Sequence, residues 1–264
     1  MIIHVLIQCS KKKSLIPKNN LIWSRSTELN SWKEEWVNEE KRFLVTKLYS
    51  GRSIKKEFDL INSNNDIKGY VISAGAGLIR INDLIPSYES TFLDNGPNFL
   101  QWHQLPHGGL SNLVIDSDDK IVSFSSPSYH RALLADPDFS RLASKFVVAQ
   151  TSPLSKNKDV TSIPIHPRTA EYLGIAHIDL NSEILRLYLE FGEQGLNEIC
   201  NECESLPPLD ERRTVSNNEL ISVVESLESI SSITKSVEYI RHTLGISASY
   251  ERIRETILFV RNKI

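Results

Sequence analysis

Four short apolar runs, each followed directly by small or polar residues, constrain the fold of this 264-residue chain more than any other feature. They are His4–Gln8, Gly69–Ser73, Lys120–Ser125 and Lys145–Gln150. Helical patterns separate them, and strands that alternate with helices are typical of a parallel sheet. We therefore predict an α/β fold with a mostly parallel central sheet flanked by helices. In such sheets the binding site lies at the carboxyl ends of the strands.

The segments between these runs carry the expected helices. Residues 53–64, 127–143 and 179–204 have helical periodicity, and residues 27–48 place Trp32 and Trp36 on one helical face. The pattern stops at two consecutive prolines and becomes helical again from residue 216. We predict two domains: residues 1–205, an α/β domain for catalysis and nucleic-acid binding, and residues 206–264, a small all-helical region.

Bulk properties indicate a soluble cytoplasmic protein. No apolar run approaches the roughly 20 residues that a membrane-spanning helix needs, so we expect no membrane partner. Lys11, Lys12 and Lys13 follow the first apolar run, whereas an export signal has its basic residues before it. The three cysteines lack the spacing of a disulfide framework, which suits a reducing compartment. Cys200 and Cys203 form a single pair, which we interpret as ordinary helix residues.

The net charge of −3 is unevenly distributed. Residues 1–170 hold 21 basic and 17 acidic residues, residues 171–230 hold 3 and 13, and residues 231–264 hold 6 and 3. Two mildly basic ends around an acidic connector suit a protein whose ends approach a polyanion. The alternative is an acidic linker helix that serves only solubility.

The C-terminal segment has the pattern of a helix-turn-helix. Residues 234–244 place Val237, Ile240 and Leu244 at helical spacing, and Gly245-Ile246-Ser247 supplies a glycine stop and an N-cap serine. The next helix, from Ala248, should turn inward the side chains of Tyr250, Ile253, Ile257 and Val260. Its basic residues come early, as in a recognition helix. The alternative is a helical hairpin that only packs on the domain.

Four segments of the chain form a recognisable set: Cys9–Lys13, Leu48–Arg52, Ile72–Ile79 with Asp83 and Ile85–Tyr88, and Ser126–Tyr129. The third has a serine and small residues before a Gly-Leu pair, then an aspartate and a Pro-Ser-Tyr segment. Together these segments resemble the bacterial family of small proteins related to the YaaA peroxide-stress proteins. The sequence departs from the family pattern at Ala76, where the family usually has an aromatic residue or histidine.

The resemblance covers about residues 1–190 and implies DNA binding. Some related defence proteins suggest a DNA N-glycosylase, which removes a modified or damaged base, with phage defence as its setting. Such an enzyme flips the nucleotide, stacks the base and stabilises an oxocarbenium-like sugar. We expect Asp83, Lys11 and Tyr88 to be catalytic: Asp83 stabilises charge or polarises water, Tyr88 stacks on the base, and Lys11 holds a flanking phosphate.

Further residues are expected to bind substrate or DNA because of their place in the pattern. Glycines after the second run would let a ligand approach the backbone closely, and Gln150 would read a base edge. The substrate-binding residues expected are Cys9, Ser10, Ser73, Gly75, Gly77, Ser125, Tyr129 and Gln150. The DNA-binding residues expected are Lys12, Lys13, Arg52, Ser247, Ser249, Arg252 and Arg254.

Each of these residues also has a plainer interpretation. Asp83 could cap the turn that follows it, Tyr88 could pack in the core, and the three lysines could form a solvated loop. Glu89 and Asp94 remain rival carboxylates for Asp83.

The sequence is therefore consistent with three functions. The first is the base-excising N-glycosidase acting on double-stranded DNA with a flipped nucleotide, without a cofactor or metal. The second is a non-enzymatic DNA-binding stress protein, and the third is an enzyme of free nucleosides or nucleotides. The chain contains no Gly-x-Ser-x-Gly, Walker or His-Glu-x-x-His motif, which argues against serine hydrolases, P-loop NTPases and zinc proteases.

Overall fold

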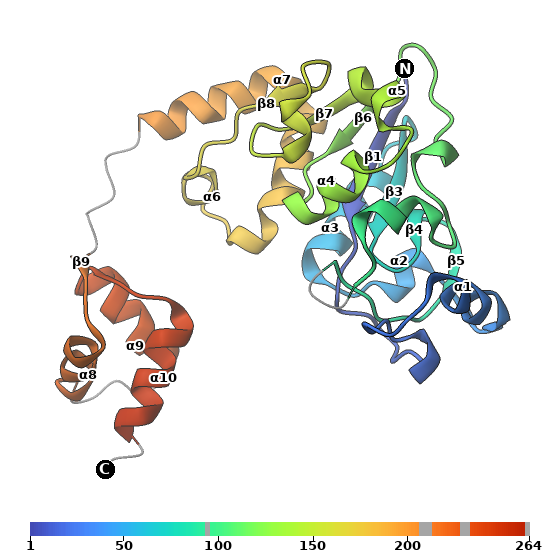
Figure 1. The fold of residues 1–264 in the computed structure, drawn as a ribbon. Helices are drawn as coiled ribbons and strands as arrows, with labels where there is room; N and C mark the ends of the chain where they lie inside the picture. Colours follow the sequence, from blue (N-terminus) through green and yellow to red (C-terminus); the bar gives the residue numbers. More distant parts are fainter. Residues whose placement is uncertain (93–95, 206–212, 228–232, 262–264) are drawn as a thin grey trace. The chain divides into compact units, whose positions relative to one another are not determined.

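A computed structural model describes residues 1–92, 96–205, 213–227 and 233–261 of the chain. The chain forms two compact units, Met1–Ser205 and Leu206–Ile264 (Figure 1). Among the described residues, no helix combines the length and apolar character needed to cross a bilayer. Each unit has a hydrophobic core of its own.

Unit 1 is built on a six-stranded sheet in the order β4-β3-β1-β6-β7-β8. All neighbouring strands are parallel except β3 and β4, so the predicted α/β fold with a mostly parallel sheet is confirmed. The strands of this sheet are β1 (Ile3–Gln8), β3 (Ile67–Ser73), β4 (Gly77–Arg80), β6 (Lys120–Ser123), β7 (Phe146–Ala149) and β8 (Thr161–Ile163). A separate antiparallel pair joins β2 (Arg42–Leu44) and β5 (Leu84–Pro86).

The four apolar runs form β1, β3, β6 and β7, as predicted. The other two strands of the sheet, β4 and β8, were not predicted from the sequence. Both missed strands are short, and each lies at an edge of the sheet. The antiparallel β4 returns along β3 through a turn at Ala74–Ala76, with Ser73 opposite Gly77 and Tyr70 opposite Arg80. This return determines where Asp83 lies.

Helices cover both faces of the sheet. On one face α3 packs against α7, and on the other α4 packs against two short 3-10 turns. The helices of unit 1 are α1 (Leu29–Asn38), α2 (Val45–Leu48), α3 (Arg52–Asn62), α4 (Pro127–Leu134), α5 (Phe139–Leu142), α6 (Thr169–Tyr172) and α7 (Leu180–Glu204). Its 3-10 turns are η1 (Asn19–Leu21), η2 (Phe99–Gln104), η3 (Leu110–Asn112), η4 (Ala143–Lys145), η5 (Pro153–Lys156) and η6 (His177–Asp179).

The strand order creates a switch point at β1, the strand between β3 and β6. The chain leaves β1 for α3 on one face, whereas it leaves β6 for α4 on the other. Loops that diverge to opposite faces leave a crevice at the carboxyl ends of the strands, where α/β sheets bind ligands. The carboxyl ends of β1, β3 and β6 therefore define the edge to examine for a site.

The described residues of unit 2 form three α-helices and a short strand pair. The helices are α8 (Asn217–Glu225), α9 (Ile233–Glu238) and α10 (Tyr250–Arg261), and α9 continues into the π-helical turn η7 (Tyr239–Thr243). The strand β9 (Arg213–Thr214) pairs in parallel with β10 (Ile246–Ser247). Gly245 has a φ of 60°, so it ends the preceding helix as predicted. Ser247 lies in β10, and the side chain of Ser249 accepts from the backbone N–H of Arg252 at 3.1 Å. The predicted N-cap Ser247 is therefore wrong by two residues.

The core of unit 2 confirms the inward positions expected for α10. Ile253, Ile257 and Val260 are buried there with Val237 and Ile240, whereas Leu244 is exposed and lies outside this core. The side chain of Tyr250 lies outside the described part of the structure. α8 completes this core, so the helix pair is part of a three-helix unit.

Glu57 is a buried carboxyl group behind the switch point. It lies on α3, is 4% exposed, and borders a small cavity together with Ser125 and Asn181. Burial raises its pKa from 4.5 to about 8. Between these two values the unfolded chain has released a proton that the folded chain retains, so stability falls as pH rises through this interval.

Replacing Glu57 with glutamine should remove this pH dependence. At pH 8 we expect Glu57→Gln to raise the free energy of unfolding by roughly 2–4 kcal/mol, because a neutral amide carries no ionisation cost. Chemical denaturation at several pH values between 5 and 8 measures the effect. The exposed Asp59→Asn on the same helix is the control. Parallel stability curves for wild type and Glu57→Gln would contradict the assignment.

Candidate active site at the carboxyl ends of β1 and β3

A hydroxyl chain lies at the carboxyl end of β3. Tyr88 forms short hydrogen bonds to Ser73 and to Tyr49. The backbone N–H groups of Gly75 and Ala76 donate to Ser73 Oγ, at 3.3 and 3.0 Å. These donors occupy both lone pairs of the serine oxygen. We infer that Ser73 donates to Tyr88 and that Tyr88 donates to Tyr49.

The two hydrogen-bonded tyrosines, Tyr49 and Tyr88, remain neutral. Burial raises the pKa of both Tyr49 and Tyr88 far above the usual value. Because both rings are completely buried, their hydroxyl groups depend on each other and on Ser73 for hydrogen bonds. Sequence reasoning assigned no role to Tyr49, although it lies inside one of the matching segments.

Two tryptophans hold the turn after β3 in place. Trp32 Nε1 donates to the carbonyl of Gly75 at 2.7 Å, and Trp102 Nε1 donates to the carbonyl of Ser73 at 2.9 Å. Buried indole N–H groups need such partners. The turn is therefore held at both ends by side chains from distant parts of the sequence.

The glycines of the turn make room for protein rather than for a ligand, which corrects the sequence-based expectation. A Cβ at Gly75 would lie 2.7 Å from the ring of Tyr88. Gly77 has a φ of 94°, and a Cβ there would lie 2.2 Å from the carbonyl oxygen of Gly108. Only glycine fits at these two positions.

Lys13 lies over the two tyrosine rings. Its Nζ is 4.4 Å from the ring centroid of Tyr88 and 5.4 Å from that of Tyr49. A short antiparallel bridge between Lys13 and Tyr49 holds the loop after β1 in this position. Desolvation lowers the pKa of Lys13, and the neighbouring Cys9 and Glu89 oppose this shift. An amine with a lowered pKa is a better nucleophile at neutral pH.

Cys9 and Tyr129 adjoin this lysine and complete what we call the edge cluster: Cys9, Lys13, Tyr49, Ser73, Tyr88 and Tyr129. The hydroxyl of Tyr129, from α4, lies 3.3 Å from Cys9 Sγ and donates to the carbonyl of Cys9 at 3.2 Å. Ser10 follows Cys9 in sequence and lies against Gly51, where an added Cβ would approach Ser10 Oγ to 2.3 Å. Loops after β1 and before α3 and a residue of α4 thus meet at one edge.

Tyr88 does not fit the predicted role of stacking on a base. Its ring is 0% exposed and packs against Trp32 and Trp36, with Lys13 on it. A flipped base would find no free ring face. The packing interpretation of Tyr88 is the one that the structure supports.

Asp83 lies elsewhere. Because β4 runs back along β3, the residues after Arg80 lie toward the start of β3 and away from Ser73. Asp83 Oδ2 accepts from the backbone N–H of Arg80 at 3.0 Å and lies 3.5 Å from His107 Nδ1. Its pKa is lowered: desolvation, the largest contribution, acts against the shift, and the hydrogen bonds from His107 and Arg80 outweigh it. Asp83 caps its own turn, and the structure does not bring it to the edge cluster.

Ser125 and Gln150 follow β6 and β7. Ser125 is hydrogen-bonded to Ser123, whose Oγ lies 3.0 Å from His130 Nε2. His130 Nδ1 in turn lies 2.7 Å from Ser152 Oγ, after β7. Gln150 is exposed two strands away from β1. Burial lowers the pKa of His130 to about 4, so this neutral bridge, which the sequence analysis missed, is structural.

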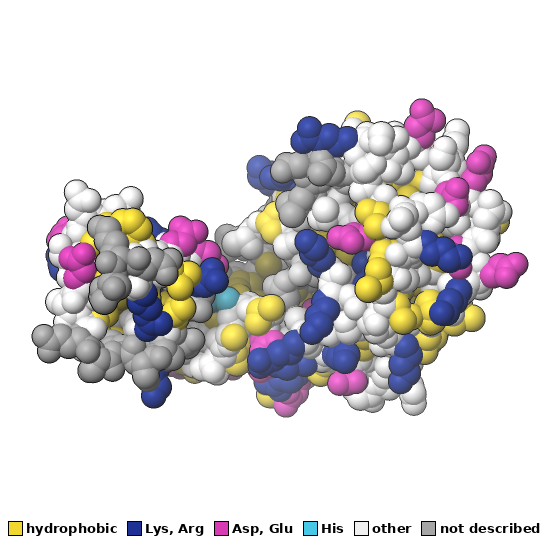
Figure 2. Space-filling model, turned by 90° about the horizontal axis from the view of Figure 1, so that it is seen from below, with side chains coloured by type: hydrophobic (Ala, Val, Ile, Leu, Met, Phe, Trp, Pro, Cys, Tyr) yellow, Lys and Arg dark blue, Asp and Glu magenta, His cyan; other side chains and the backbone are white. Residues whose placement is uncertain are grey.

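The lysines and arginine expected to bind DNA differ in their surroundings. Lys11 and Lys12 are exposed in the loop after β1. Arg52 forms an ion pair with Asp179 at 2.6 Å, which leaves it less free to bind a phosphate. β1 runs downward in Figure 1, so Figure 2, seen from below, faces the carboxyl ends of the strands. Lys and Arg side chains are spread over the middle of this face of unit 1.

Comparison with protein-family models, with curated proteins and with solved structures finds no match for this chain. Function must therefore be argued from the geometry. Among the described residues, no three His, Cys, Asp or Glu side chains come together as a metal site. Asp94, the rival carboxylate, lies outside the described residues, whereas Glu89 is close enough to influence Lys13.

In unit 2 the two arginines of α10 have different environments. Arg252 donates to Asn217 Oδ1 at 3.0 Å and to the carbonyl of Val215 at 2.7 Å. It therefore joins α10 to the start of α8, which leaves it less free to contact DNA than the sequence predicts. Arg254 is exposed, and so are Ser247 and Ser249.

Gly75→Ala tests the role of the turn. The added methyl group would press on the Tyr88 ring, and we expect a loss of about 1–3 kcal/mol of stability with a change in tryptophan fluorescence. Gly174→Ala is the control, because open space surrounds that glycine and only backbone strain at its φ of 66° would act. An equal and small effect of both substitutions would contradict the tight contact at Gly75.

Proposed function

We propose that this protein is a DNA-processing enzyme, a DNA N-glycosylase, whose reactive group is the amine of Lys13. The observation that carries the proposal is the half-buried Lys13 over Tyr49 and Tyr88 at the carboxyl ends of β1 and β3. Ligands of parallel sheets bind at this edge, and the lowered pKa of Lys13 favours the neutral, nucleophilic amine.

The proposed reaction is a displacement at the sugar carbon C1′. A bond forms between Lys13 Nζ and C1′ while the bond from C1′ to the base breaks, and its electron pair leaves with the base. The amine gives one proton to the departing base. The bond from C1′ to the ring oxygen then breaks as the imine forms, and that oxygen takes the second proton of the amine. Water then adds to the imine, which returns the free lysine and leaves an abasic aldehyde, so the net reaction is hydrolysis.

The other members of the edge cluster position Lys13. Tyr88 is held by Ser73 and Tyr49, and the two rings give the lysine a fixed surface. Lys11 and Lys12 are exposed beside it and suit the phosphates that flank a flipped nucleotide. The YaaA-like resemblance is the reason for proposing a modified base from a phage genome as the substrate.

The second unit is proposed to contact duplex DNA through α10. Arg254, Ser247 and Ser249 are exposed at its start and before it. A recognition helix presents its early residues to the major groove.

Lys13→Arg should abolish base release. Arginine retains the positive charge but is not a nucleophile at neutral pH, so we expect the rate to fall by about a thousandfold while DNA affinity is unchanged. The assay measures released base and abasic sites on modified and unmodified duplex DNA. Borohydride should trap a covalent complex of wild type with DNA, and Lys12→Arg, the control, should retain both properties.

Other outcomes would select the rival functions. Base release by Lys13→Arg at the wild-type rate would exclude Lys13 as nucleophile. Salt-dependent binding without release would indicate a DNA-binding protein. Activity on mononucleosides alone would indicate a nucleoside enzyme.

The two arginines of α10 should behave differently when each is replaced by alanine. Arg254→Ala should weaken duplex binding and lower the salt dependence by about one phosphate contact, with unchanged thermal stability. Arg252→Ala should lower the melting temperature, because the carbonyl of Val215 loses its donor. Fluorescence anisotropy and thermal denaturation measure these effects. Full affinity in Arg254→Ala would remove α10 from the proposed interface.

A further inference from the structure

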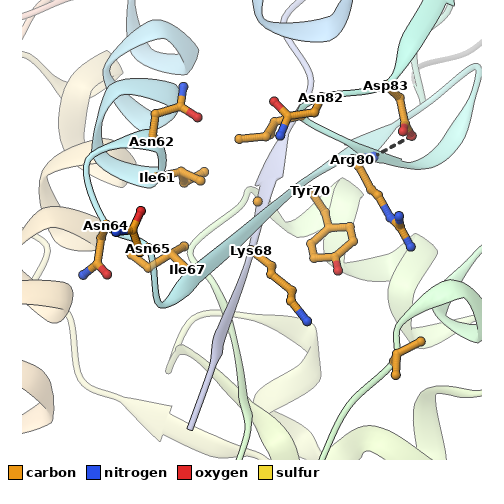
Figure 3. Close-up of a pocket in the computed structure, with 13 residues that line it drawn as sticks. Ile61, Asn62, Asn64, Asn65, Ile67, Lys68, Tyr70, Arg80, Asn82 and Asp83 are labelled. Carbon is orange, nitrogen blue, oxygen red and sulfur yellow. Dashed lines mark hydrogen bonds between the residues drawn. The ribbon is translucent and has the colours of Figure 1, made fainter.

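A second polar groove lies at the other end of β3. Because β4 pairs only with Tyr70–Ser73, the first residues of β3 (Ile67 and Lys68) have no strand on their outer side among the described residues. The carbonyl of Gly69, the next residue, accepts from the backbone N–H of Ile81 at 3.1 Å. The end of α3 and the turn after β4 border this open edge. Together they enclose about 620 Å³, within the range of ligand pockets. Figure 3 shows side chains that line the groove, among them Asn62, Asn65, Lys68, Tyr70, Arg80 and Asn82.

Two cations flank one tyrosine in this groove. Lys68 and Tyr70 are two residues apart on β3, and Arg80 lies opposite Tyr70, so all three side chains project from the same face of the sheet. Figure 3 shows Lys68 and Arg80 on either side of Tyr70. Both cations are exposed, and neither forms an ion pair with a described residue. Such a pair can take one anionic group between its members.

Free amides line the other side of the groove. Asn62, Asn65 and Asn82 are exposed, and their side chains form no hydrogen bond with the described residues. Asn64 differs, because its Oδ1 accepts from the backbone N–H of Asp66 at 2.9 Å. An asparagine amide both donates and accepts, which matches the edge of a nucleobase. Val114, 74% exposed, adds an apolar contact for a base.

The charge of the groove limits the kind of phosphate. Lys68 and Arg80 contribute two positive charges, and Asp83, which turns toward His107 and the backbone of Arg80, contributes one negative charge. A net charge of about +1 complements the single charge of a phosphodiester better than the nearly double charge of a terminal phosphate.

We propose that this groove binds a nucleotide unit of a single nucleic-acid strand, with the phosphodiester between Lys68 and Arg80 and the base against Asn62, Asn65 and Asn82. The strand would cross the open edge of β3 from one face of the sheet to the other. Lys68 and Ser73 are five residues apart on β3, so the groove lies roughly 17 Å from the edge cluster. The proposal therefore describes a separate site and does not require the glycosylase activity.

The test is binding of a fluorescein-labelled single-stranded oligonucleotide to the full chain, measured by anisotropy at about 50 mM salt, where phosphate contacts are strong. Lys68→Glu/Arg80→Glu should weaken binding about tenfold or more. The matched control is Arg131→Glu/Lys158→Glu, which reverses the charge of two exposed cations outside the groove. Asn62→Ala/Asn82→Ala should weaken binding while the salt dependence stays the same, because amides release no counterions.

Competitors distinguish the sources of the nucleotide unit. An unlabelled dinucleotide with one phosphodiester should displace the oligonucleotide better than deoxyadenosine monophosphate, and inorganic phosphate should be the weakest competitor. Stronger competition by the mononucleotide would overturn the assignment to a strand.

Further outcomes separate this proposal from the glycosylase. Unchanged binding by Lys68→Glu/Arg80→Glu, or an equal loss of binding in the matched control, would contradict the proposal that the groove binds the strand. Lys13→Arg should bind the oligonucleotide like wild type. If wild type releases no base but the groove variants still lose affinity, the result supports strand binding in the groove and contradicts the glycosylase activity.

Discussion

The hydrogen-bond chain from Ser73 through Tyr88 to Tyr49 is the interaction on which the carboxyl edge of unit 1 depends. It connects the end of β3, the segment after β5 and the residue that follows α2, which are far apart in sequence. All three hydroxyl groups are buried, so the loss of one would leave another without a partner at a cost of about 1–3 kcal/mol. These hydrogen bonds hold in place the two tyrosine rings over which Lys13 lies.

The same constraint explains why the turn contains glycine. The Tyr88 ring occupies the space that a side chain at Gly75 would need, and Gly108 occupies the space beside Gly77. Trp32 and Trp102 then hold the carbonyl groups at the two ends of the turn. A rigid surface of this kind suits a site that orients a reactive amine, because positioning accounts for much of enzymatic catalysis.

β3 links the two proposed sites. Its carboxyl end supplies Ser73 to the edge cluster, and its amino-terminal half supplies Lys68 and Tyr70 to the asparagine-lined groove. The groove exists because β4 is shorter than its neighbour. Asp83, predicted as a catalytic carboxylate, belongs to the groove, because an antiparallel return carries the chain back toward the start of β3.

Local patterns in the sequence were enough to predict the type of the fold and its four central strands. Four buried runs with intervening helices predict a parallel sheet, since apolar periodicity depends on local burial. Gly245 and the inward face of α10 were equally readable, because these are local signals. The tertiary structure alone decided which side chains meet. Neither the return of β4, which separates Asp83 from Ser73, nor the burial of Tyr88 and the engagement of Arg252 with Val215 has a local signature. Each depends on long-range packing, because a residue's partners are set by strand pairing and core contacts rather than by its spacing along the chain.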